Sequence, residues 1–133
     1  YFFNNALEMY QNEIKVEDIC VAAINLYLGL TLSQNDDLDE AFEHYSESHR
    51  IYEENLGEND LETARSLLHL GRIQRRRGNF KESLECLHEV LRVRKSLLGI
   101  HDFLVKEAYI HIAKVLRESG NEVEAKKYYR LVL

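Results

Sequence analysis

Five arginines gather in one short stretch of the chain and form the strongest chemical signal in the sequence. Residues 64–77 hold these arginines and no acid, which gives the stretch a net charge of +5. They are Arg65, Arg72, Arg75, Arg76 and Arg77. Residues 36–62 hold eleven acids and one arginine, a net charge of −10, and the whole chain carries −6. Because an acidic protein repels nucleic acid, we interpret the arginines as a site for carboxylates of a partner protein, which guanidinium groups bind through paired hydrogen bonds.

Catalytic and metal-binding chemistry finds little support in the sequence. The six histidines never form a His-Glu-x-x-His pattern, and no cysteine and histidine set has the spacing of a zinc site. His69 and His111 lie 42 residues apart, but two ligands are too few for a metal. Cys20 and Cys86 lack a paired base, so each is expected to be a small core side chain in a reducing, cytoplasmic setting. We therefore expect no enzyme activity and no cofactor.

Composition indicates helices as the elements that position these residues. The chain of 133 residues is 45% hydrophobic and 30% charged, so it can bury a core. It has no proline and only six glycines, whereas a β-sandwich or barrel needs many turn residues. We expect no apolar run to be as long as the roughly 20 residues that a helix needs to span a bilayer, so no membrane partner is expected.

A period of 42 residues explains almost the whole chain. The run Leu-Gly-x-x-Asp at 56–60 recurs at 98–102, and Gly78-Asn79 recurs at 120–121. Each period holds two amphipathic segments, about 61–77 and 80–97 in the second period, and Asp60 and Asp102 stand where an N-cap would open the first helix. Small residues recur in the middle of each first helix, where they would let the partner helix approach closely. They are Gly29, Gly71 and Ala113.

The second period has the residue spacing of a known repeat signature. The matching residues are Leu67, Leu70, Gly71, Gly78, Phe80, Ser83, Leu87 and Val90. The chain therefore resembles a tetratricopeptide repeat array, and its long period, with Leu-Gly-x-x-Asp between repeats, is similar to the kinesin-light-chain type. In the first period Asp36 replaces the turn glycine. The resemblance implies an all-α, right-handed superhelical solenoid of stacked antiparallel helix pairs, with Tyr45 and Leu87 in the core.

The period also predicts how the chain is divided. We expect residues 1–17 to be the second helix of an upstream repeat, followed by repeats at 18–59 and 60–101 and a truncated repeat at 102–133. An apolar flank would then be exposed at each end of the array. Solenoid ends normally carry polar caps, so self-association through these ends is expected.

The resemblance also locates a binding face, because this family holds peptides on a concave face built from the first helices. At 100° per residue, Arg65, His69, Arg72 and Arg76 form one stripe. Leu68 and Arg75 flank the stripe, and the neighbouring periods supply the equivalent positions. The expected partner-binding residues are Tyr27, Leu30, Arg65, Leu68, His69, Arg72, Arg75, Arg76, His111, Lys114 and Arg117.

The leading hypothesis is therefore a non-catalytic module that binds an acidic, partly apolar peptide in its groove. One alternative is an architectural scaffold that assembles through its convex face or its ends. Another is the sensing half of a larger multidomain protein. A further interpretation of the arginines stays open, namely that they pair with acids of a neighbouring repeat or are simply solvated.

Overall fold

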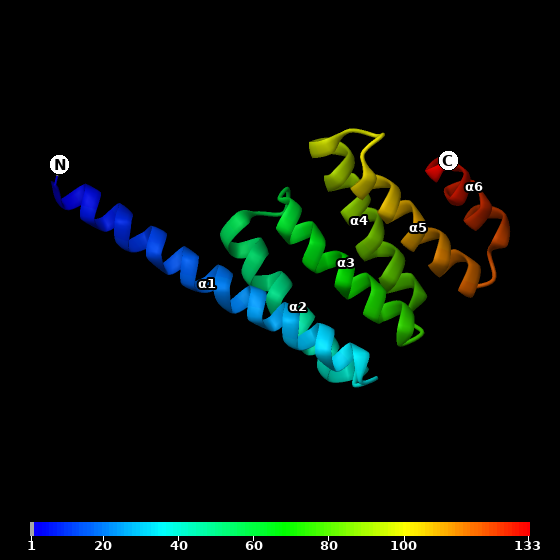
Figure 1. The fold of residues 1–133 in the computed structure, drawn as a ribbon, viewed down its shortest axis with the longest axis horizontal. Coiled ribbons are helices and arrows are strands. Elements are labelled where there is room, and N and C mark those ends of the chain that lie inside the picture. Colours follow the sequence, from blue (N-terminus) through cyan, green and yellow to red (C-terminus); the bar gives the residue numbers. More distant parts are fainter. Residues whose placement is uncertain (1) are drawn as a thin grey trace.

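The computed structural model describes the backbone of residues 2–133 and the side chains of residues 5–9 and 15–133. Within this part the chain forms six helices and no strand. They are α1 (Phe2–Gln34), α2 (Leu38–Leu56), α3 (Leu61–Arg76), α4 (Phe80–Leu98), α5 (Phe103–Glu118) and α6 (Glu122–Val132). Each odd-numbered helix forms an antiparallel hairpin with the next one, and the three hairpins stack side by side (Figure 1). The predicted all-α stack of helix pairs is confirmed.

In the second repeat the helices begin where the period predicts and end within one residue of the predicted ends. The Asp60 carboxylate accepts a hydrogen bond from the Glu62 N–H at 2.8 Å, and the Asp102 carboxylate accepts one from the Leu104 N–H at 2.9 Å. Both predicted N-caps are thus confirmed. Between the two helices of each pair the chain turns through a positive φ, at Asp36 (63°), Gly78 (84°) and Gly120 (96°). Asp36 therefore adopts the glycine conformation that its position in the period requires.

The predicted boundary between residues 17 and 18 is absent, because α1 runs unbroken from Phe2 to Gln34. The helices α2 and α4 end at Gly57 and Gly99, whose φ values are 84° and 87°. One period earlier the same position holds Lys15. A side chain at positive φ costs about 1–2 kcal/mol, so at Lys15 the helix continues. The first half of α1 consequently projects beyond the other helices (Figure 1).

The small residues of the first helices lie where the second helix of the same hairpin comes closest. A Cβ atom added to Gly29 would lie 2.6 Å from the Tyr45 ring, and one added to Gly71 would lie 3.0 Å from the Leu87 side chain. Tyr45 and Leu87 are themselves buried, as predicted. The prediction that these glycines permit close helix packing is confirmed.

The length and composition of α1 correct one expectation. Lys15–Gln34 is a stretch of 20 residues with a mean hydropathy of 1.4, long and apolar enough to cross a membrane by those two measures. Part of its apolar surface is core, because Ala22 and Leu26 are buried where α1 packs on α2. The absence of a membrane partner stays a prediction.

Candidate partner-binding face

The predicted partner-binding residues lie on α1, α3 and α5, the first helices of the three hairpins. Polar contacts hold neighbouring first helices together at their C-terminal ends. Arg75 on α3 pairs with Glu118 on α5 at 2.8 Å, and Arg76 on α3 donates to the Ser33 carbonyl of α1 at 2.9 Å. We call the surface that these three helices share the first-helix face.

A hollow of about 200 Å³ opens on this face between α1 and α3. Its lining residues are Leu30, Ser33, Gln34, Tyr45, His69, Arg72, Ile73 and Arg76. The His69 ring stacks on the Tyr45 ring, with centroids 5.4 Å apart and planes 19° apart. Tyr45 was predicted as core alone. The structure shows that its ring also lines the hollow, a role that the residue spacing did not predict.

Three of the five arginines are held by contacts within the fold. Arg75 pairs with Glu118, as described above. Arg76 also pairs with Asp36 at 2.6 Å, and Arg77 pairs with Asp39 at 3.2 Å while its guanidinium lies 4.4 Å from the centre of the Phe42 ring. For these arginines the interpretation as pairs with acids of a neighbouring element is confirmed.

Arg72 is the arginine of the stripe that has no such partner. Among the described residues no acid lies within ion-pair distance of its exposed guanidinium. Arg65 has only a loose pair with Glu62, at 3.8 Å on the same helix. One period along, Lys114 on α5 likewise has no ion pair within the described part of the chain. The positive charge open to a ligand is therefore centred on Arg72 and extends to Arg65 and Lys114.

Two histidines flank Arg72 and are kept neutral. Burial lowers the pKa of His69 to about 4, with the Arg72 and Arg65 charges as further causes of the same shift. Burial likewise lowers the pKa of His111 to about 4, with Arg72 and Lys114 as additional causes. At neutral pH both rings are thus uncharged donors and acceptors beside the Arg72 guanidinium.

The apolar members of the predicted set divide into exposed and buried residues. The Tyr27 side chain is exposed, and Leu30 is half-buried in the wall of the hollow. Leu68 is a correction, because its side chain is only 4% exposed and belongs to the core cluster that α3 shares with α5. It lies about 60° from the stripe, and on that side it enters the core cluster to which α4 and α5 both contribute. Leu68 therefore contributes stability and does not contact a partner.

The other chemistry-bearing residues take positions away from the hollow. Cys20 is exposed on α1, so its prediction as a core side chain is wrong, and Cys86 is half-buried. Burial raises the pKa of the Cys86 thiol to about 11, which makes this cysteine a poor nucleophile. Within the described residues, no three His, Cys, Asp or Glu side chains are arranged to hold a metal ion.

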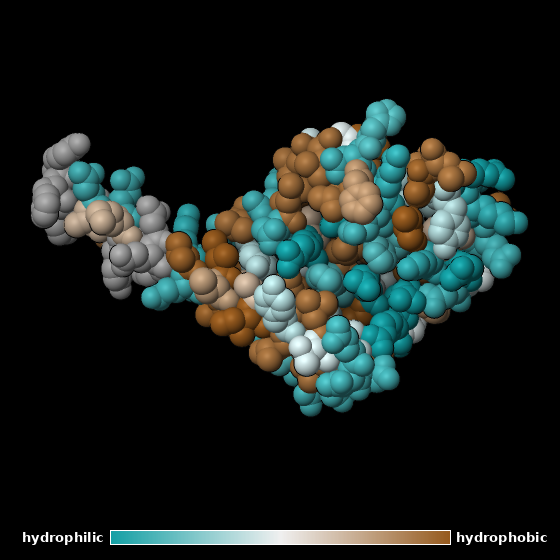
Figure 2. Space-filling view, in the orientation of Figure 1, coloured by the Kyte–Doolittle hydropathy of each residue, from teal (hydrophilic) through white to brown (hydrophobic). Residues whose placement is uncertain are grey.

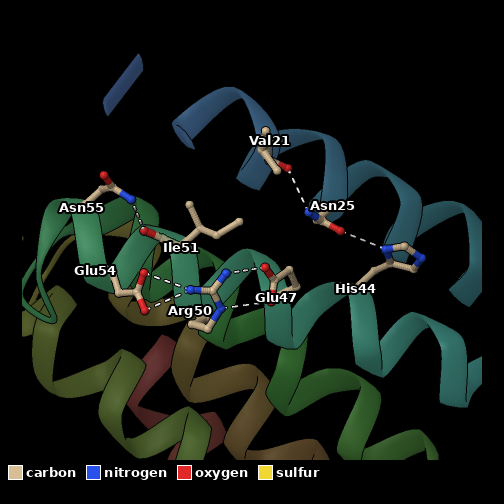
Figure 3. Close-up of polar contacts among 8 residues, drawn as sticks. All are labelled: Val21, Asn25, His44, Glu47, Arg50, Ile51, Glu54 and Asn55. Carbon is tan, nitrogen blue, oxygen red and sulfur yellow. Dashed lines mark hydrogen bonds and ion pairs between the residues drawn. The ribbon is translucent and has the colours of Figure 1, made fainter. Parts of the chain in front are cut away.

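The acid-rich helix α2 is organised by its own polar contacts. Its one arginine, Arg50, lies between Glu47 and Glu54 and bonds to both carboxylates (Figure 3). At the α1–α2 contact, Asn25 bonds to the His44 ring at 2.9 Å (Figure 3). Glu53 pairs with His49 on the same helix, so within α2 Glu40 and Glu43 are the acids without an ion pair among the described residues.

Comparison with known proteins identifies the repeat. The family model described as Tetratricopeptide repeat matches residues 20–96 and 68–133. A search of curated protein sequences gave no match.

Solved structures share the fold at low sequence identity. The protein BtubC (BKLC) of P. vanneervenii superimposes with a TM-score of 0.78 at 19% identity, over 84% of this chain and 44% of its own. The TPR domain of Arabidopsis FLU gives a TM-score of 0.75 at 22% identity, over 89% and 93%. A putative kinesin light chain of Podosopora anserina, with nearly identical TPR-like repeats, gives 0.73 at 20% identity, over 84% and 53%.

The chain therefore spans about half the length of the first and third of these proteins. Their likeness to it shows the fold, and the Podosopora anserina protein is a putative kinesin light chain, the repeat type that the long period predicts. Since the family model accounts for residues 20–133, the chain belongs to the tetratricopeptide repeat family, whose repeats generally act as protein–protein interaction modules.

Proposed function

We propose that the chain binds an acidic, partly apolar segment of a partner protein on the first-helix face. The observation that carries this proposal is the position of Arg72, an exposed guanidinium without an acid partner, at the edge of the hollow between α1 and α3. Arg75, Arg76 and Arg77 already have partners within the fold. A ligand carboxylate would therefore find Arg72 ready to form two parallel hydrogen bonds.

The neighbours of Arg72 suit a carboxylate ligand at this point. His69 and His111 are neutral, so each can donate one ring N–H to the same ligand without adding charge. Lys114, one repeat along, is placed for a second acid of an extended segment. Cations that repeat along the array suit a ligand whose acids also repeat.

The apolar part of the ligand would lie toward α1. Tyr27 is exposed there, and Leu30 lines the hollow beside Tyr45. An aromatic or aliphatic side chain in this place would bury apolar surface next to the charged contact, which is the usual composition of a binding hot spot. An extended segment becomes ordered on binding, so micromolar affinity is expected.

The test measures binding of labelled peptides that combine two or three acids with one aromatic residue, at low and high salt. Arg72→Glu with Lys114→Glu is expected to lower affinity at least tenfold, and added salt is expected to weaken binding of the parent chain. The matched control is Lys81→Glu with Lys127→Glu, the same charge change at exposed residues of α4 and α6. Circular dichroism confirms that both double variants stay helical. Equal losses in the two variants would mean that net charge, and not this face, governs binding.

A second candidate function is architectural, and exposed apolar residues at both ends of the stack favour it. At the C-terminal end, Ile110, Tyr129, Val132 and Leu133 line an open apolar pocket together with Lys126 and Arg130. At the other end, α1 exposes a row of apolar side chains. Assembly that persists in the Arg72→Glu, Lys114→Glu variant would show that the ends act independently of the first-helix face.

A further inference from the structure

The sequence of α1 carries an apolar repeat of seven residues that hairpin packing does not explain. Heptad positions spaced alternately by four and three residues run from Phe3 to Leu28, and all of them are apolar except Glu17. The first positions of the heptads are Leu7, Ile14, Val21 and Leu28, and the fourth positions are Phe3, Tyr10, Glu17, Ile24 and Thr31. A heptad pattern sustained over four heptads is the signature of pairing between two helices.

The heptad residues whose side chains are described lie on the surface. Leu7 is 47% exposed, Val21 48%, Ile24 58% and Leu28 44%. Figure 2 shows hydrophobic atoms gathered along α1, between its projecting end and the body of the molecule. The residues that pack on α2, such as Ala22 and Leu26, are buried on a different side of the helix.

The other first helices show what normally covers this side. One period after Val21, Ile24 and Leu28 stand Thr63, Ser66 and Leu70 of α3, and two periods after them stand Val105, Ala108 and Ile112 of α5. All six of these residues are buried. The preceding second helix lies over them, α2 on α3 and α4 on α5, with His49 bonded to Ser66 at 3.1 Å. The heptad side of α1 is thus the side that an antiparallel second helix covers on α3 and on α5.

The projecting half of α1 has the sequence of such a covering helix. Residues 2–14 correspond by the period to residues 44–56 of α2 and 86–98 of α4. Because Lys15 stands where Gly57 and Gly99 turn the chain, the projecting half continues straight and does not fold back on its own helix. It can instead cover the same side of α1 in a second copy.

We propose that two copies of the chain pair through their α1 helices, antiparallel about a twofold axis. His49 lies opposite Ser66, and a shift of both by one period places Leu7 opposite Ile24 of the second copy. The same register places Tyr10 opposite Val21, Phe3 opposite Leu28 and Ile14 opposite Glu17. Each first position of a heptad then meets a fourth position of the other helix, as an antiparallel pair requires.

The paired segments would overlap over a long stretch of α1. The overlap from residue 3 to residue 28 is about 38 Å long at 1.5 Å per residue. It exchanges an identical element between two copies, which creates a dimer without new secondary structure. Glu17 is the one acid at a core position, and it lies close to the twofold axis. An acid there weakens the pair and disfavours shifted registers, in which it would meet a more apolar layer.

The first test is the mass of the whole chain in solution, by sedimentation equilibrium over a range of concentrations. A concentration-dependent dimer is expected, and Val21→Glu with Ile24→Glu is expected to weaken it more than a hundredfold. Glu17→Leu is expected to tighten it at least tenfold. Val123→Glu with Leu131→Glu, the same change at exposed positions of α6, is the matched control and leaves the dimer constant within twofold. A monomer up to the solubility limit, or assembly that the α6 variant abolishes, would overturn the proposal.

The second test determines the direction of the pair. Residues 13 and 20 each directly precede a first heptad position, and in an antiparallel pair such positions of the two helices lie side by side. Residue 13 of one copy therefore lies beside the exposed Cys20 of the other. In Glu13→Cys, mild oxidation should link Cys20 to the introduced thiol, and peptide mapping by mass spectrometry identifies the bridge. Bridges that join Cys20 to Cys20 would show a parallel pair and refute the antiparallel one.

A vesicle flotation assay tests whether the apolar stretch of α1 binds a lipid membrane instead of a second copy. Vesicles of neutral and anionic phospholipids are mixed with the parent chain and with the Val21→Glu, Ile24→Glu variant. No flotation is expected when the heptad side is occupied by a second copy. A chain that floats with the vesicles and stays monomeric in water would contradict the pairing and assign this side to lipid.

Discussion

The contact between Arg94 and Glu107 offers the sharpest prediction about stability. Arg94, on α4, is only 3% exposed, and its Nη1 donates to the Leu104 carbonyl and to the Glu107 carboxylate, each at 2.9 Å. The Nε of Arg94 is buried without a hydrogen-bond partner. This guanidinium therefore depends on Glu107 to balance its charge at the junction of α4 and α5.

The two ends of this ion pair should respond unequally to substitution. Glu107→Ala leaves a buried guanidinium without a counter-charge, a change that costs about 3–5 kcal/mol of unfolding free energy. Arg94→Met removes the charge and fills most of its volume, and the Glu107 side chain, one-third exposed, can then be solvated. The cost of Arg94→Met is expected to stay below about 1.5 kcal/mol.

The assay is urea unfolding followed by circular dichroism, with all proteins at one concentration because pairing through α1 would add to apparent stability. Glu107→Gln serves as a control, since the amide keeps an acceptor but not the charge, and its cost should lie between those of the other two variants. An Arg94→Met variant less stable than Glu107→Ala would refute the reasoning, because the arginine would then act through packing alone.

Three further predictions concern packing, pH and capping. Gly29→Ala is expected to lower the unfolding free energy by about 1–2 kcal/mol, because strain against the Tyr45 ring exceeds the helix propensity of alanine, and urea unfolding measures the loss. Burial and Arg72 lower the pKa of His69 to about 4 in the folded chain. As pH falls below about 6.5, His69 therefore becomes protonated in the unfolded chain before it does in the folded chain. Stability should then decline by up to about 3 kcal/mol down to pH 4, and His69→Gln should decline less over the same range. Asp102→Ala should cost about 1 kcal/mol by removing the cap of α5, whereas Asp102→Asn should cost little, and a similar loss in both would contradict the capping role.

The period of 42 residues predicted the helices of the second and third repeats because each signal is local. Asp60 and Asp102 cap the helices that follow them, and Gly78 turns the chain, through contacts within a few residues of sequence. The prediction failed at residues 17 and 18, where the spacing persists but Lys15 stands in place of the turn glycine.

The sequence predicted where the candidate binding face lies, but not which of its residues are free to contact a ligand. Helical spacing placed His69 and Arg72 on one stripe, and the structure brings both to the hollow beside α1. The spacing could not distinguish Arg72 from Arg75, because the acid that engages Arg75 lies 43 residues away on α5. Nor could it show that Leu68 is buried in the core cluster that α3 shares with α4 and α5.

The sequence by itself determined the fold class, the repeat length, the caps and the helix faces, since all of these depend on residues within one or two turns of a helix. Only the tertiary structure decided which charges are neutralised, which apolar residues are buried and which side of α1 remains open. Those outcomes depend on contacts between helices a whole period apart, where each side chain meets whichever neighbour the stacking brings to it.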